Sequence, residues 1–250
     1  MKKTKKVIIA LIAVLTALAL FLVGVMSFVI IDKKDLFDRF KDENKYKTVI
    51  FEQEYNTEDI KNIKVDVNCA DITFKSAEDE FVKVTVYGLN ENKFCGEVKN
   101  GILSLEEIRG RVTFDFPSFS FRGLKIIVSL PAGFNSPVDI DSNIGDVDFQ
   151  TECNFNLNVN LSTGDFEAYS LAGRFDISSD TGDVDIKNAK PSENSSITVT
   201  TGDIEIENVS NTKIRYDSSV GDEEVYGSDE NSNVTLTVKT DTGDIEVNDN

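Results

Sequence analysis

A Gly-Asp pair recurs six times between residue 138 and the C-terminus, at steps of 19, 18, 20, 19 and 22 residues. Fixed-period self-similarity of this length is typical of solenoids, in which one unit buries its apolar face only by stacking on its neighbours. The repeat therefore predicts a stacked array of similar units. The six glycines are Gly145, Gly164, Gly182, Gly202, Gly221 and Gly243.

Apolar and polar residues alternate on both sides of each Gly-Asp pair. The second and fourth residues after the glycine are apolar at eleven of twelve positions, and the residue between them is always acidic. A period of two is that of a β-strand with one buried face. Each unit is thus predicted to be two short strands joined at a corner, where glycine tolerates positive φ and the Asp side chain closes an Asx-type turn. The exception, Glu223, is best explained by a local bulge that re-aims the strand.

The N-terminal part predicts a membrane anchor. Residues 7–31 carry no charge, and four lysines precede them in residues 1–6. At about 1.5 Å per residue this run spans a bilayer core as one helix, and the lysines favour a cytoplasmic N-terminus with the bulk of the chain extracytoplasmic. A cleaved signal peptide ending near Ala17–Ala19 is the competing interpretation. Residues 32–47 then form a charged juxtamembrane linker.

Residues 48–137 are predicted to form the N-terminal β part of the ectodomain. Residues Ile63–Phe74 fit the repeat register as a divergent copy, with Ala70 where glycine stands later. Residues 138–250 are the Gly-Asp solenoid. The predicted fold is an all-β solenoid of two-strand units, each about 19 residues long, preceded by one transmembrane helix. Further strand-like segments are Phe81–Tyr87, Gly101–Ile108, Arg111–Phe116 and Leu124–Leu130.

Charge excludes several function classes. Residues 138–250 hold 25 acidic and 6 basic side chains, a net charge of −19. Nucleic acid and anionic lipid are poor partners for such a surface, whereas metal cations and basic peptides suit it. The chain has no histidine, so Ser-His-Asp and Cys-His catalysis are excluded, and no acidic pair stands out for carboxylate chemistry. The sequence therefore predicts a protein that is not an enzyme and carries no cofactor.

Two columns of carboxylates follow from stacking the units in register. One hypothesis is that they bind divalent cations such as Ca²⁺, which prefer clustered oxygen ligands. The alternative is structural, with the first acid closing the turn and the second forming a solvated face that discourages aggregation. The candidate residues are Asp146, Asp148, Asp165, Glu167, Asp183, Asp185, Asp203, Glu205, Asp222, Glu224, Asp244 and Glu246.

Three cysteines are too few for a disulfide scaffold in an exported chain of this length. Cys69 and Cys95 are one candidate pair. The array is expected to end at Val247 with an uncapped edge, which predicts weak self-association or the addition of a partner strand there.

The order of these motifs resembles a known family. An anchor is followed by the Ile63–Phe74 unit, a strand ending in Leu-Pro at Leu130-Pro131, and Thr-Gly-Asp units such as Thr181–Ile186. The chain resembles the DUF4097 family of bacterial adhesin candidates, which is related to toast-rack domains of the Lia and Psp envelope-stress modules. The resemblance implies an extracytoplasmic β-helix-like domain that binds or signals and supplies no catalytic residues.

Two function classes remain open. The first is an accessory of an envelope-stress or surface-sensing system, with a protein partner in the cell envelope. The second is a structural or adhesive surface protein, whose acidic face binds wall polymer, a divalent cation or a basic peptide. Both place the chain in the cell membrane as a single-pass protein.

Overall fold

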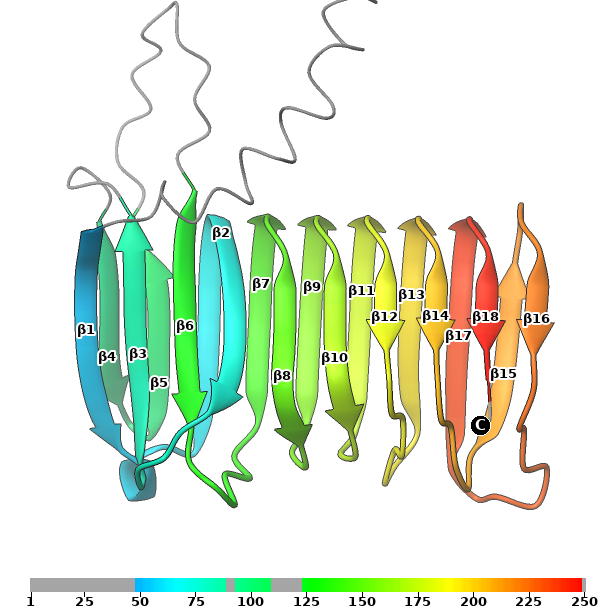
Figure 1. The fold of residues 1–250 in the computed structure, drawn as a ribbon, viewed down its shortest axis with the longest axis horizontal. Coiled ribbons are helices and arrows are strands. Elements are labelled where there is room, and N and C mark those ends of the chain that lie inside the picture. Colours follow the sequence, from blue (N-terminus) through cyan, green and yellow to red (C-terminus); the bar gives the residue numbers. More distant parts are fainter. Residues whose placement is uncertain (1–47, 89–92, 109–122, 249–250) are drawn as a thin grey trace, which may run out of the picture. The chain divides into compact units, whose positions relative to one another are not determined.

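A computed structural model describes residues 48–88, 93–108 and 123–248 of the chain (Figure 1). The predicted membrane span, both of its flanks and the strand-like segment at Arg111–Phe116 lie outside these residues. Within the described ranges, no helix has both the length and the apolar character needed to cross a bilayer. The regular elements there are strands, apart from the 3-10 helix η1 (Thr57–Asp59).

The strands form two facing sheets that share β2 (Asn62–Ser76), whose first half belongs to one sheet and whose second half belongs to the other. In spatial order, sheet A contains β1 (Thr48–Asn56), β3 (Phe81–Gly88), β6 (Leu124–Leu130), the second half of β2, β8 (Val147–Cys153), β10 (Phe166–Leu171), β12 (Val184–Ile186), β14 (Ile204–Ile206), β18 (Ile245–Val247) and β16 (Glu223–Val225). Sheet B contains β4 (Phe94–Lys99), β5 (Ile102–Glu107), the first half of β2, β7 (Val138–Ile144), β9 (Leu157–Thr163), β11 (Phe175–Thr181), β13 (Ser195–Thr201), β17 (Thr235–Thr242) and β15 (Lys213–Ser218).

Each repeat contributes one strand to each sheet, and we call this pair of strands a rung. Successive rungs pair in parallel, so that Val147 lies beside Phe166, and Phe166 beside Val184. These three side chains face the space between the sheets and are at most 1% exposed. The stacked array predicted from the Gly-Asp period is confirmed, because the aliphatic and aromatic residues of successive copies lie over one another as a continuous core.

The divergent copy predicted around Ala70 is also a rung. In β2, Ile63 pairs with Val138 of β7, and Ile72 pairs with Val147 of β8. Before this rung the pairing changes, because β1, β3 and β4 run antiparallel to their neighbours and form that end of the stack (Figure 1).

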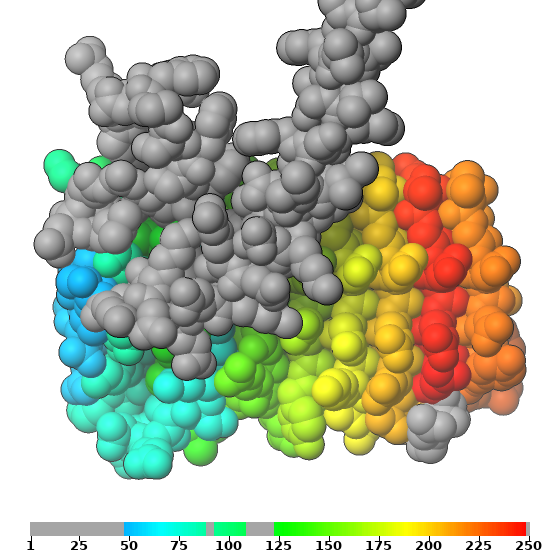
Figure 2. Space-filling view, turned by 45° about the horizontal axis from the view of Figure 1, so that its top comes forward, coloured from blue at the N-terminus to red at the C-terminus, as the bar shows by residue number. Residues whose placement is uncertain are grey.

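The order of the last rungs differs from the order of the sequence. Strand β13 pairs with β17, and β17 pairs with β15, so the C-terminal copy lies between the fourth and fifth Gly-Asp copies. Sheet A repeats this order as β14, β18 and β16. In Figure 2 the red C-terminal strands accordingly lie inside the stack, with orange residues beyond them. The prediction of an uncapped edge at Val247 is therefore wrong, and among the described residues the strands at this end of the stack are β15 and β16.

Two smaller predictions are corrected as well. Strand β16 pairs with β18 without a register shift, so no bulge exists at Glu223. Glu223 is instead exposed because its rung is the last one. No disulfide joins Cys69 to Cys95. Cys95 pairs with Glu106, which pairs with Asp66 of β2, so two strand spacings of roughly 4.8 Å separate Cys95 from β2, beyond the usual Cα reach of a disulfide.

Candidate functional site

The aspartates of the Gly-Asp corners form a ladder of hydrogen bonds along the stack. Each donates its backbone N–H to the Oδ1 atom of the aspartate in the rung before it. The sequence predicted that each side chain closes its own turn, whereas these carboxylates bond to the neighbouring rung. The donor and acceptor pairs are Asp146 to Asp71 (3.3 Å), Asp165 to Asp146 (3.0 Å), Asp183 to Asp165 (2.9 Å), Asp203 to Asp183 (2.8 Å), Asp244 to Asp203 (2.7 Å) and Asp222 to Asp244 (2.8 Å).

A second line of carboxylates, which we call the acidic column, runs along the outer face of sheet A. Its members sit between the two inward-facing residues of each strand and pair directly with one another across neighbouring strands. Like charges directly opposite each other on adjacent strands are destabilising. In stacking order the acidic column consists of Asp148, Glu167, Asp185, Glu205, Glu246 and Glu224.

The pKa values of the acidic column reflect this crowding. Burial raises the pKa of Glu167, and the neighbouring carboxylates Asp148 and Asp185 raise it further. The pKa of Glu205 is raised by burial and then by Asp185 and Glu246. The acidic column is therefore a place where negative charge is costly and where a cation would be stabilising.

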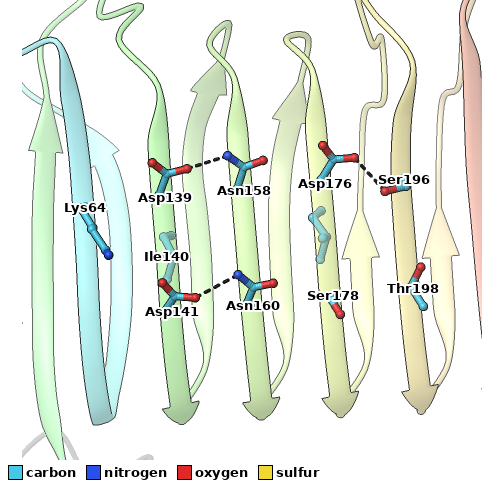
Figure 3. A pocket seen from close by; sticks show the side chains of 11 residues that line it. Lys64, Asp139, Ile140, Asp141, Asn158, Asn160, Asp176, Ser178, Ser196 and Thr198 are labelled. Carbon is cyan, nitrogen blue, oxygen red and sulfur yellow. Dashed lines mark hydrogen bonds between the residues drawn. The ribbon is translucent and has the colours of Figure 1, made fainter.

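On the outer face of sheet B, the carboxylates have different neighbours from those of the acidic column (Figure 3). This face has a shallow hollow of about 600 Å³ that includes Lys64. Around the hollow, Asp139, Asp141 and Asp176 each accept a hydrogen bond from a residue on a neighbouring strand, whereas Asp66 at its margin pairs with the acids Asp141 and Glu106. The bonds join Asn62 and Asn158 to Asp139 (2.8 and 2.6 Å), Asn160 to Asp141 (2.9 Å) and Ser196 to Asp176 (2.8 Å).

All twelve acidic residues predicted as ligands are thus in two lines, as expected, but the lines have different chemistry. The corner carboxylates accept backbone N–H groups, except that of Asp222 at the end of the ladder. In the acidic column, Asp148 and Glu246 accept side-chain amides from Gln150 (2.6 Å) and Asn248 (2.7 Å), and the other four carboxylates have no such donor among the described residues. Among the described residues, no group of three or more His, Cys, Asp or Glu side chains could hold a metal ion. Calcium binding stays a prediction.

Sequence reasoning missed the contrast between the two faces, and it missed Tyr169. This tyrosine is 54% exposed and lines a hollow of about 340 Å³ with Glu167, Asp185 and Lys187. The sequence held a signal for the contrast. The outward positions of the sheet B strands in the repeats mix acids with Asn, Ser, Thr, Arg and Lys, whereas those of the acidic column are always acidic.

The raised pKa values predict how stability depends on pH. Burial raises the pKa of Asp71 and Asp165 above 3.8, and of Glu167 and Glu205 above 4.5. A carboxyl group whose pKa is higher in the folded state binds protons more tightly there, so its stabilising contribution is present at low pH and is lost as pH rises through the raised pKa. Glu230, whose pKa Lys213 lowers, has the opposite sign but is fully exposed.

We therefore expect the free energy of unfolding to be higher near pH 4 than at pH 8. Urea denaturation at the two pH values measures the difference. The double variant Glu167→Gln/Glu205→Gln should show a smaller difference, because both groups then no longer titrate. A protein that is more stable at pH 8 would contradict this expectation.

Comparison with known proteins assigns the chain to a family. The model of the family described as Toastrack DUF4097 matches residues 60–249. The chain belongs to the DUF4097 family. The match covers every Gly-Asp rung and the whole of the rung built on β2, so the DUF4097 resemblance seen in the sequence is confirmed. No curated protein matches this DUF4097 chain.

Solved structures similar to this DUF4097 protein come from several bacteria. A cell adhesion candidate from Clostridium sporogenes aligns with a TM-score of 0.48 at 14% identity, covering 79% of this chain and 97% of its own. An adhesin candidate from Bacteroides fragilis aligns with a TM-score of 0.43 at 15% identity, covering 81% and 98%. A lipid-binding candidate from Parabacteroides distasonis aligns with a TM-score of 0.31 at 15% identity, covering 79% and 95%.

Proposed function

We propose that the protein is a non-catalytic interaction module that binds a cationic chain, such as a basic peptide or an amine-bearing wall polymer, along the acidic column. The observation that supports this is the contrast between the two faces. In sheet B, Asp139, Asp141 and Asp176 each accept a hydrogen bond from a neighbouring strand. In the acidic column six carboxylates pair in succession across strands, and among the described residues only Asp148 and Glu246 accept an amide, each from a residue two positions along the same chain segment. At roughly 5 Å in water each neighbouring pair repels by about 0.8 kcal/mol, which a bound cation offsets.

The geometry favours an elongated ligand. Strand spacing places the carboxylates roughly 4.8 Å apart, so six of them span roughly 24 Å along the stack. A flexible polyamine-like chain can match this repeat, because lysine-type side chains carry their charge on a long stem. Tyr169 lies beside Glu167 at the hollow and offers a ring face to an ammonium group.

Binding of a labelled octalysine peptide to the full-length protein, followed by fluorescence anisotropy, tests the proposal. We expect affinity that falls with salt and that weakens by at least about tenfold when three charges of the acidic column are removed. A control variant removes three exposed charges elsewhere and should weaken binding by less than about threefold. The column variant is Asp185→Asn/Glu205→Gln/Glu246→Gln, and the control is Asp180→Asn/Glu193→Gln/Asp241→Asn.

Equal losses in the two variants would mean that only the overall negative field attracts the peptide, and the proposal would fail. Adding Ca²⁺ in place of the peptide separates the metal alternative, because a specific site gives heat and a raised melting temperature in the wild type but not in the column variant.

The same proposal places the module outside the cell, anchored by residues 7–31 as a single helix. The charge-free run and the four lysines before it support this placement. Such a module serves an envelope-stress or surface-sensing system, or alternatively adhesion to the wall. Protease added to intact cells should digest the chain beyond residue 32, and full protection would exclude the placement. Loss of an envelope-stress response on deletion, without loss of surface attachment, favours the sensing role.

A further inference from the structure

The end of the stack formed by β15 and β16 has one closed edge and one open edge. The closed edge is that of β15 in sheet B. Ile214 donates its backbone N–H to Ser228 Oγ at 3.1 Å, and Ser218 donates its own to Glu223 Oε1 at 2.6 Å. In addition, the N–H of Asp229 reaches the carbonyl of Thr212 at 3.0 Å. Side chains and a loop therefore occupy the positions that another strand would need on this side.

The open edge is that of β16 in sheet A. Ile245 of β18 donates its N–H to the Asp222 carbonyl at 3.0 Å, and Tyr226 donates to the Val247 carbonyl at 2.8 Å. Backbone groups along a strand point alternately to one side and the other, so those of Glu223 and Val225 point away from β18. In every earlier rung the residues at these two positions bond to the next rung, and β16 is the last strand on its side among the described residues.

The surroundings of this edge define what fits it. Asp222 is the last member of the corner ladder, in which each earlier carboxylate accepts an N–H from the next rung. Together with Glu223 and Glu224 it makes the edge acidic. Two exposed apolar side chains flank the edge, Val220 at 65% and Tyr226 at 61% exposure. A complementary strand is thus basic opposite the two glutamates and apolar opposite Val225.

We propose that β16 is a docking edge for an extended, basic strand of a partner protein, which adds as one more parallel rung of sheet A. The backbone N–H at the start of this added strand donates to the Asp222 carboxylate, as the corner aspartate of each rung donates its N–H to the aspartate carboxylate of the rung before it. Its following groups pair with the open backbone of Glu223 and Val225, by the strand-addition mode of peptide recognition. A second copy of this chain is a poorer occupant, because residues 138–250 carry a net charge of −19. This edge is distinct from the acidic column, of which it includes only the terminal member, Glu224.

A synthetic peptide with the sequence Thr-Gly-Asn-Lys-Lys-Val-Lys copies a rung corner with lysines at the two glutamate positions, and it is the probe. Binding to the full-length protein is followed by anisotropy, and amide hydrogen exchange of Glu223 and Val225 by NMR. We expect both amides to exchange at least about tenfold more slowly when the peptide is bound, because they become paired.

Two substitutions of Val225 separate the contribution of its backbone N–H to peptide binding from that of its side chain. Val225→Pro removes an edge N–H that bonds to no other strand of the described chain, and proline is tolerated on edge strands. Val225→Thr keeps the N–H and nearly the same shape. We expect the proline variant to weaken peptide binding at least about tenfold and the threonine variant by less than about threefold, with melting temperatures checked for both.

Equal binding by the two variants, or unchanged amide exchange, would overturn the inference. So would binding that the column variant Asp185→Asn/Glu205→Gln/Glu246→Gln abolishes, since the peptide would then occupy the acidic column; that result would leave the proposed function standing. Conversely, if the column variant bound octalysine as tightly as the wild type does, the proposed function would be wrong and the docking proposal for β16 would be unaffected. A dimer that sedimentation detects in the wild type and not in Val225→Pro would show that the occupant is a second copy instead.

Discussion

Replacing Gly182 with alanine is expected to lower the free energy of unfolding by more than about 3 kcal/mol, because two separate costs add at this corner. Gly182 has a φ of +142°, a backbone conformation that residues other than glycine rarely adopt. A Cβ atom there would also lie 2.0 Å from the carbonyl oxygen of Gly164 in the neighbouring rung. The two rungs would have to separate to admit it, which weakens the hydrogen bonds that join them at the corner, from Asp183 N–H to Asp165 Oδ1 and from Gly164 N–H to the Thr181 carbonyl.

Gly133 provides the matched control for this prediction. Its φ is +80°, but a Cβ atom added to it meets nothing within 4 Å. Gly133→Ala should therefore cost only the conformational strain, about 1 to 2 kcal/mol. Urea denaturation of the two variants separates strain from close approach of the rungs. If both variants lost the same stability, the close packing at the corner would not be the cause.

The two-strand unit was predictable because its information is local. Within each copy the alternation of apolar and polar residues fixes which face is buried, and the Gly-Asp pair fixes where the chain turns. Stacking then follows, because one unit cannot bury its own apolar face.

The order of the rungs was harder to predict, because parallel rungs of similar shape can in principle stack on any neighbour. The sequence nevertheless held the reason for the order. The copy that contains Tyr216 and Glu223 has a large polar ring and a charge at inward positions, and in the structure these side chains are exposed. The C-terminal copy has Leu236, Val238 and Ile245 there, all at most 1% exposed. Placing the polar copy at the end of the stack leaves its charge in water, which costs less than burying it.

The candidate site was predictable only in part for a similar reason. The positions of both acidic lines followed from the repeat. The direction in which the Asp165 or Asp183 carboxylate bonds did not, because it depends on how closely the next rung approaches. The pairing of Asn158 with Asp139 in sheet B likewise required the register between two copies, which no single unit contains.

Truncating Phe149 to alanine is the second change with a large expected effect, about 3 to 5 kcal/mol. Its ring is fully buried and stacks on Phe74 with centroids 4.3 Å apart and planes 3° from parallel. It also contacts Phe166 at 5.9 Å. The side chain therefore joins the rung built on β2 to the first two Gly-Asp rungs, and its removal leaves a cavity that rigid strands on both sides cannot close.

Phe149→Leu should cost less, about 1 to 2 kcal/mol, because it keeps most of the buried volume. Tyr169→Ala, an aromatic truncation on the exposed face of the adjacent strand, should change stability by no more than about 0.5 kcal/mol. Urea unfolding of the three variants, followed by far-ultraviolet circular dichroism, ranks them. Since the rungs stack as one continuous core, Phe149→Ala is expected to shift the whole transition. A separate early transition would instead mean that the N-terminal strands and the repeats unfold independently, with Phe149 at the boundary between two cooperative units.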